Sequence, residues 1–255
     1  MQSHWDESPS FFILRGASVE QRPHITNPPV YLLGIDTSTT VGSVALFHHQ
    51  IPILSTTIYL DKSHAQLLAR GIDSLLALAG ITSRQLSAIA LSQGPGSYTG
   101  LRIGASTAKG LCFSLDIPLI SVDTLASMAH QVLPFAAPED IFCPMIDARR
   151  MELFWCLYDS SLQPLWPVQA HVLSPESENL FLNYSHVWIF GSASTKAAPF
   201  LGTDRFQKVE DIRPSALSIG HLAYSKWLNQ QFADLAYFEP FYLKEFYSNK
   251  LTNDY

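Results

Sequence analysis

The sequence predicts an α/β fold in which one order of strands and helices occurs twice. Apolar runs of strand length alternate with stretches whose apolar residues recur every three or four positions, as on an amphipathic helix. The pattern restarts near residue 138, and each copy opens with two strands joined at an acidic turn, at Asp36 and at Asp147. We therefore predict two α/β halves of one plan, as an internal duplication would produce.

The first half opens with an antiparallel meander, because three short apolar runs are separated only by tight turns. The expected strands are residues 31–35, 41–47 and 51–60. Pro52 is compatible with the third run, since proline is tolerated at the start of a strand or on an edge strand. Leucines at helical spacing then predict a helix over residues 64–79, which Gly80 can end.

The remaining elements follow in the same order in both copies. The first half continues with a strand at 88–91, a glycine-rich loop, a helix at about 100–115, a strand at 119–122 and a further helix. The second half comprises a strand–turn–strand over 141–165, a third strand at 167–174, a helix at 174–184, a strand at 186–195 and a helix at 215–230. We therefore place an N-terminal subdomain at 31–136 and a C-terminal one at 137–255, and interpret residues 1–30 as a disordered extension.

Composition excludes several functional classes. The 255 residues carry a net charge of −6 and contain no block of lysines or arginines, so the electrostatic footprint of a nucleic-acid binder is missing. Cys112, Cys143 and Cys156 lie far apart without zinc-finger spacing, which favours buried, reduced thiols in a reducing compartment. No apolar run is long enough to span a membrane, and we expect a cytoplasmic protein.

The stretch "GPGSYTGLRIG", residues 94–104, has the look of a phosphate loop but lacks the lysine of a Walker A motif. The first amides of the following helix could still bind an anion. Alternatively, Ser97 or Thr99 caps the helix and the glycines only form the turn. A third interpretation starts from Gly100 and Gly104, which share one helix face and would let another backbone approach, from the core sheet or from a second subunit.

The polar turns allow two interpretations each. Asp36, Thr37 and Ser38 could position a phosphate or its magnesium ion, or they could form a local Asx or Ser/Thr turn. Asp147 lies with Arg149 and Arg150 in a charged turn, which is either functional or a surface hairpin with a local ion pair of little energetic weight. The sequence contains no HxxxH, HExxH or GxSxG motif, so it offers neither a helix-borne metal site nor a serine nucleophile.

Five stretches taken together resemble the bacterial TsaB (YeaZ) family, in order from about residue 32 to residue 246. They are "LGIDTSTTVGSVAL", "SQGPGSYTGLRIGASTAKGL", "ISVDTLASMA", "MIDARRMELFWCLYD" and "EPFYLKEF". The resemblance implies duplicated actin-like (ribonuclease H-like) domains. It also implies a role in making N6-threonylcarbamoyladenosine (t6A) at position 37 of tRNAs that read ANN codons, as a non-catalytic subunit. Its implied partners are the metal-bearing transferase TsaD and the ATPase TsaE, with tRNA reached only through the complex.

The resemblance also implies what to expect of metal binding and nucleotide binding. Thr124 and Met128 stand where the catalytic paralogue TsaD carries a pair of histidines, and neither side chain is a plausible replacement ligand. Asp36 and Asp147 match the two phosphate-loop positions of the superfamily, so we expect a degenerate site around Asp36, Thr37, Ser38 and Asp147. We expect no metal or cofactor in the isolated protein, and a nucleotide only at an assembled interface.

The leading hypothesis is a scaffold whose two long helices expose a shared docking patch for TsaD or for a second copy, but not for both at once. The residues expected at that interface are His64, Leu67, Leu68, Gly71, Ile72, Leu75, Tyr98, Gly100, Leu101, Arg102, Gly104 and Ala108. The alternative is an active nucleotide-dependent kinase or hydrolase of the actin-like superfamily that uses Asp36 and Asp147. The acidic charge balance disfavours a stand-alone RNA binder.

Overall fold

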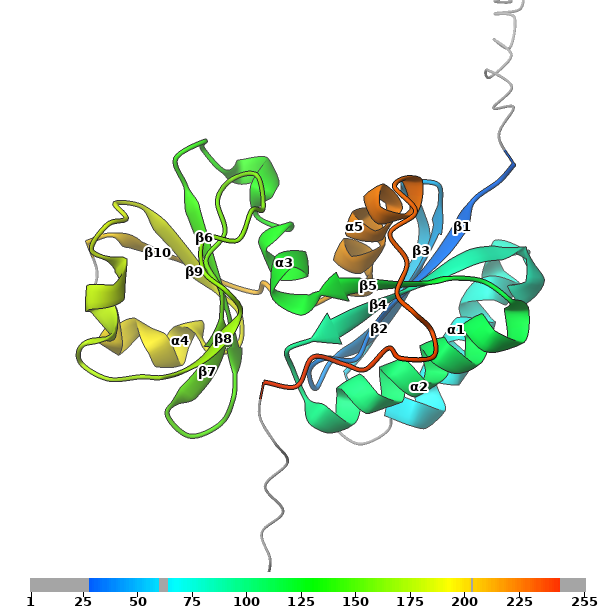
Figure 1. Cartoon of the computed structure of the whole chain (residues 1–255), viewed down its shortest axis with the longest axis horizontal. Coiled ribbons are helices and arrows are strands. Elements are labelled where there is room, and N and C mark those ends of the chain that lie inside the picture. Colours follow the sequence, from blue (N-terminus) through cyan, green and yellow to red (C-terminus); the bar gives the residue numbers. More distant parts are fainter. Residues whose placement is uncertain (1–27, 60–63, 203, 244–255) are drawn as a thin grey trace, which may run out of the picture.

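The computed structural model describes residues 28–59, 64–202 and 204–243, which form two lobes side by side (Figure 1). The predicted extension at 1–30 lies outside these residues except for its last three. Among the described helices, none combines the length and the apolar character needed to cross a membrane.

The first lobe contains a five-stranded sheet in the order β3-β2-β1-β4-β5. Its strands are β1 (Tyr31–Asp36), β2 (Gly42–His48), β3 (Ile51–Ile58), β4 (Leu86–Gly94) and β5 (Leu119–Asp123). The first three pair antiparallel, which confirms the predicted meander, and β4 and β5 join parallel to β1. Pro52 lies on β3, which is an edge strand, where its missing N–H breaks no pairing within the sheet.

The second lobe repeats this topology. Its strands are β6 (Ile141–Asp147), β7 (Glu152–Trp155), β8 (Gln169–Val172), β9 (Val187–Phe190) and β10 (Phe206–Val209). Their order, β8-β7-β6-β9-β10, corresponds strand for strand to the first sheet, with the same parallel and antiparallel pairings. The duplication predicted from the sequence is therefore confirmed at the level of topology.

The helices confirm most of the predicted elements. They are α1 (His64–Ala79), α2 (Tyr98–Leu115), α3 (Thr124–Ala129), α4 (Ser194–Ala197) and α5 (Ala216–Leu228). The helix predicted at 174–184 is wrong: only a short 3₁₀ turn, η3 (Ser177–Phe181), forms there. The physical reason is that Phe181 is buried whereas Leu180 and Leu182 remain exposed. The segment therefore packs on the core through one side chain and lacks the apolar stripe that stabilises an amphipathic helix. The short elements α4 and β10 were not predicted.

The last helix of each half contacts the sheet of the other half. α1 and α2 cover one face of the first sheet, and α5 covers the opposite face, while α3 packs into the core of the second lobe (Figure 1). Close approach of α5 requires two glycines: a Cβ on Gly34 would lie 2.6 Å from the Ala216 carbonyl oxygen, and one on Gly220 would collide with the Phe47 ring. The first sheet is thus buried on both faces.

Because α3 and α5 each pack in the opposite half, the predicted subdomains of the sequence do not coincide with the two lobes in space. A boundary after residue 136 separates the two sheets along the chain, yet α5, which follows that boundary, packs on the first sheet. The division into 31–136 and 137–255 stays a prediction about sequence, and in space the two halves share their terminal helices.

Candidate functional site

The turn between β1 and β2 uses its polar atoms within the chain. Asp36, Thr37 and Ser38 are all buried. An oxygen of the Asp36 carboxylate accepts hydrogen bonds from the Ser38 hydroxyl at 2.8 Å and from the Ser38 N–H at 3.3 Å. The Thr37 hydroxyl donates to the Gly100 carbonyl oxygen at 2.8 Å. The three residues are therefore together, as predicted, in an Asx-type turn closed by the start of α2.

The glycine-rich loop packs directly against this turn. The Ser97 N–H donates to the Ser38 carbonyl at 2.7 Å, and the Ser97 hydroxyl accepts from the Gly100 N–H at 3.3 Å, which confirms one of the predicted helix caps. A Cβ on Gly100 would collide with the Thr37 carbonyl oxygen, and one on Gly104 with the Thr37 hydroxyl. The small residues therefore provide clearance for the chain's own β1–β2 turn at the edge of the core sheet, so of the two neighbours expected for this helix face it is the first lobe's own backbone, and not a second subunit, that lies against these glycines.

The second acidic turn differs from the first in its environment. Asp147 is exposed, and its carboxylate forms a 2.6 Å ion pair with Lys196 of α4 and accepts the Arg149 N–H at 2.7 Å. The Lys196 ammonium also donates to the carbonyls of Arg150 and Glu152. A lysine of the same half thus neutralises the carboxylate that the resemblance assigns to a phosphate loop.

Thr124 and Met128 both serve the fold. The Thr124 hydroxyl accepts the Gly94 N–H at 3.1 Å, and Met128 is buried in the apolar cluster of the second lobe. A Cβ on Gly191 would collide with the Met128 methyl group and the Met145 carbonyl, so this glycine packs closely on α3. Neither Thr124 nor Met128 is a suitable metal ligand, and the described residues hold no cluster of three or more potential metal ligands.

The residues predicted to form the docking surface differ in how far they are buried. Leu68, Ile72, Leu75, Gly100, Leu101, Gly104 and Ala108 are buried within the chain. Leu67, Gly71 and Tyr98 are half-buried, Arg102 is exposed, and the His64 side chain lies outside what the structure describes. Most of the predicted set therefore faces the core, and the exposed surface lies on the opposite side of the same two helices.

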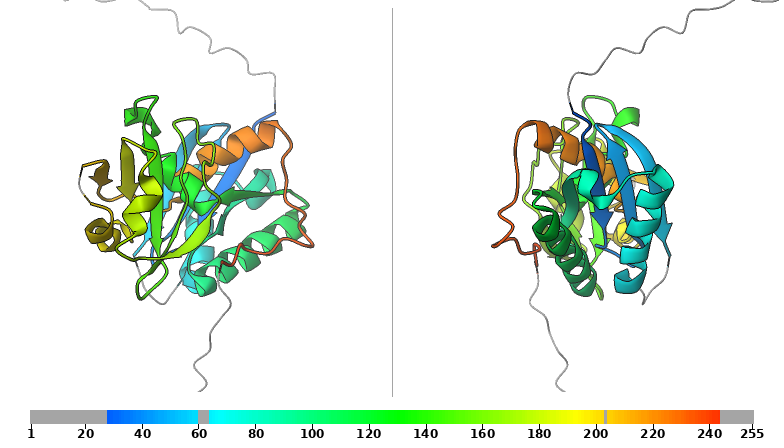
Figure 2. Two further views of the ribbon diagram at one scale, coloured as in Figure 1. Left: turned by 60° about the vertical axis from the view of Figure 1, so that its left-hand side comes forward. Right: turned by 90° about the vertical axis from the view of Figure 1, so that its right-hand side faces the viewer.

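We call that opposite side the outer helix face. It consists of Ala69, Arg70, Asp73, Ala77 and Leu78 on α1 and of Arg102, Ser106, Gly110 and Phe113 on α2. The two helices that carry these residues pack side by side (Figure 2). Leu78 and Phe113 are 80% and 83% exposed, values that stand out for large apolar side chains. A Cβ on Gly110 would meet nothing within 4 Å.

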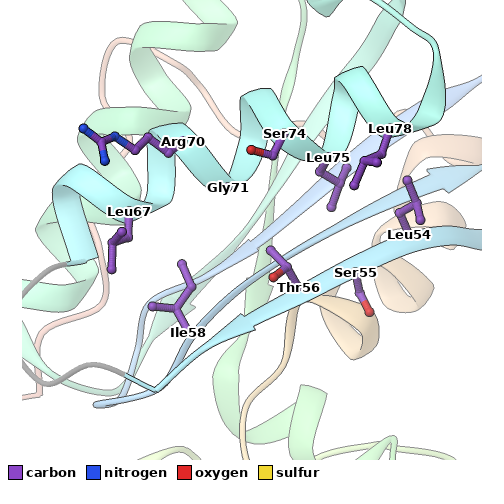
Figure 3. Close-up of a pocket in the computed structure, with 10 residues that line it drawn as sticks. All are labelled: Leu54, Ser55, Thr56, Ile58, Leu67, Arg70, Gly71, Ser74, Leu75 and Leu78. Atoms are coloured by element: carbon purple, nitrogen blue, oxygen red, sulfur yellow. The ribbon is translucent and has the colours of Figure 1, made fainter.

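A groove of about 300 Å³ runs beside this face, between α1 and the edge strand β3. Leu54, Thr56 and Ile58 line it from the strand, and Leu67 and Leu78 line it from the helix (Figure 3). Because Leu78 belongs to both, the groove extends the outer helix face toward the sheet edge. Sequence spacing had predicted both helices but not which side of each is exposed.

Comparison with known proteins identifies the class of protein that has this architecture. The family model described as TsaD, tRNA N6-adenosine threonylcarbamoyltransferase, matches residues 58–185. The solved structure titled YeaZ from Pseudomonas aeruginosa superposes with a TM-score of 0.73 at 25% identity, covering 84% of this chain and all of that one. The fold and the family match define the class: the chain belongs to the TsaD-related proteins with duplicated actin-like domains.

Two relatives narrow the assignment. The protein of Haemophilus influenzae named tRNA threonylcarbamoyladenosine biosynthesis protein TsaB is 29% identical over 223 residues, 84% of this chain and 93% of the relative. The TsaB protein of Bacillus subtilis is 37% identical over 127 residues, 50% of this chain and 54% of the relative. Within the class, the chain belongs to the TsaB (YeaZ) family.

Proposed function

We propose that this chain is the non-catalytic scaffold subunit of the machinery that makes t6A in tRNA, paired with a transferase of the TsaD kind and with the ATPase TsaE. Membership of the TsaB family supports the pathway. The observation that carries the scaffold role is the outer helix face, where Leu78 and Phe113 are exposed on neighbouring helices. A partner protein that covers these two helices would remove both side chains from water.

The polar chemistry of the chain supports an accessory role. The Asp36 carboxylate is buried against Ser38, and the Asp147 carboxylate is paired with Lys196. Both carboxylates thus interact with groups of the chain itself, which supports a role other than nucleotide-dependent catalysis. With a net charge of −6, the chain is also poorly suited to hold tRNA by itself, so we propose that tRNA is bound through the complex.

Docking on the outer helix face would draw its free energy mainly from apolar burial. Covering one phenylalanine or leucine side chain contributes about 1.5–3 kcal/mol, which corresponds to roughly tenfold to more than a hundredfold in affinity. Gly110 leaves an open depression one turn before Phe113, which allows a partner helix to lie close to α2. A second copy of the chain would use the same surface, so homodimer and heterodimer are alternatives.

The test is co-purification of the chain with the TsaD-type transferase and the TsaE-type ATPase of its own cell, followed by an assay of modified tRNA. Phe113→Asp should weaken pairing with the transferase at least about tenfold and reduce tRNA modification. Phe135→Asp is the matched control, because Phe135 is 78% exposed but lies in a 3₁₀ turn away from α1 and α2. Equal effects of the two substitutions, or undiminished pairing of Phe113→Asp, would refute the proposed face.

A calorimetric titration of the isolated chain with ATP and magnesium tests the absence of intrinsic catalysis. We expect no turnover. Micromolar binding accompanied by hydrolysis would instead support the kinase or hydrolase alternative.

A further inference from the structure

The chain that follows α5 does not return to the second sheet but runs along α2. We call residues 233–243 the strap (the red segment in Figures 1 and 2). It begins with the Ala233 N–H, which donates to the Leu119 carbonyl at 2.8 Å at the start of β5. The Lys109 ammonium of α2 then donates to the carbonyls of Ala236 and Phe238, at 3.2 and 3.1 Å. The first part of the strap is therefore held beside α2 by isolated hydrogen bonds, without a continuous strand ladder, and by the packing of Ala233, Leu235 and Phe238 against the core of the first lobe.

The end of the strap lies over the start of α2. The Phe241 N–H donates to the Gln93 carbonyl at 2.7 Å, and a Cβ on Gly94 would come within 2.7 Å of the Phe241 carbonyl oxygen. The Tyr242 ring packs on the Tyr98 ring with centroids 4.8 Å apart. Gly94 of the glycine-rich loop is thus small because the strap passes over it.

Arg102 connects the strap to the outer helix face. Its guanidinium lies 4.8 Å from the centre of the Tyr98 ring, and it hydrogen-bonds the Tyr242 side chain. Arg102 is also the first residue of the exposed ridge that continues through Ser106 and Gly110 to Phe113, a length of about 16 Å along the helix. A partner helix that covers the whole ridge must reach the residues that Tyr242 now contacts.

The strap is suited to local opening. Phe241 is 42% exposed, and Tyr242 belongs to none of the four apolar clusters of the described residues. Segments with few buried apolar contacts and isolated hydrogen bonds open at a small fraction of the global unfolding free energy. Release of residues 239–243 would uncover the Tyr98 ring and the Gln93 carbonyl next to Arg102, and the one apolar core contact that it would give up is that of the half-buried Leu243 with the second lobe.

From these contacts we infer that the end of the strap is an intramolecular competitor of the docking partner: it covers the first turn of α2 in the free chain and leaves when a TsaD-type partner docks. The inference rests on the proposed docking face. Because the strap must open first, the apparent affinity of the free chain is reduced by the fraction of molecules whose strap is open. Any substitution of a strap residue that loosens the strap and leaves every residue of the outer helix face unchanged should therefore tighten binding.

Tyr242→Ala is such a substitution, and Tyr237→Ala is its matched control. Tyr237 lies in the same strap but is 84% exposed, so its loss should leave the strap in place. We expect Tyr242→Ala to accelerate hydrogen exchange at the Phe241 amide and to bind the purified transferase about three- to tenfold more tightly. The control should change neither quantity, and complex formation should accelerate exchange at Phe241 in the wild-type chain.

The outcomes separate this inference from the proposed function. If the wild-type chain binds the transferase but Tyr242→Ala binds no more tightly, or if the complex slows exchange at Phe241, competition by the strap is wrong and the docking face stands. If the wild-type chain does not bind the transferase at all, the proposed function fails and the competition fails with it.

Discussion

Two glycines of α2 should respond oppositely to alanine. Alanine improves helix propensity by about 1 kcal/mol over glycine at either position. Gly110 faces open space, so Gly110→Ala should stabilise the chain by up to about 1 kcal/mol. At Gly104 the new methyl group would collide with the Thr37 hydroxyl and lie 3.0 Å from a Leu91 methyl. Overpacking costs about 1–3 kcal/mol, and loss of the hydrogen bond donated by Thr37 costs about 1 kcal/mol. The gain in helix propensity offsets about 1 kcal/mol of this cost, so Gly104→Ala should destabilise the chain by about 1–3 kcal/mol.

The assay is urea unfolding followed by far-ultraviolet circular dichroism for both variants and for Thr37→Ala alone and combined with Gly104→Ala. Because Thr37→Ala removes the colliding oxygen, Gly104→Ala should cost clearly less in that background, as a double-mutant cycle would show. Stabilisation by Gly104→Ala, or strict additivity of the two substitutions, would mean that the helix does not pack on the β1–β2 turn as described.

Three further predictions concern the contacts between and within the halves. Burial lowers the pKa of His130 and of His221 below the usual 6.5, so the unfolded chain takes up protons first as the pH falls. The contribution of these two imidazoles to the unfolding free energy should be constant above about pH 7 and fall as pH drops through about 6.5. The fall should be less steep in His130→Gln, as measured by urea midpoints across that range. Tyr158→Phe removes the 3.0 Å hydrogen bond to the half-buried Asp123 carboxylate and should cost about 1–3 kcal/mol in the same assay; an unchanged midpoint would contradict this. Lys196→Met breaks a half-exposed ion pair and should cost no more than about 1 kcal/mol, so a loss above about 2 kcal/mol would show a larger role.

The sequence predicted some parts of the candidate site correctly and missed others. Asp36, Thr37 and Ser38 were placed together correctly, because three adjacent polar residues between two strands must share one turn. That Gly100 and Gly104 pack on that turn was not predicted, because the partners are more than sixty residues apart in the chain. The exposed Phe113 carried a usable signal, since it lies on the side of α2 opposite the buried Ala108, but Gly110 beside it resembles any other helix glycine.

By itself the sequence determined the duplicated order of strands and helices, the positions of α1 and α2, and the family motifs. Periodicity achieves this because it depends only on neighbours along the chain, and it specifies which residues share a face. Only the tertiary structure decided what covers each face: Thr37 against the glycines of α2, α5 on the first sheet, and the strap over Tyr98. Small residues permit close approach by any backbone, so their pattern cannot distinguish a partner helix from the chain's own turn.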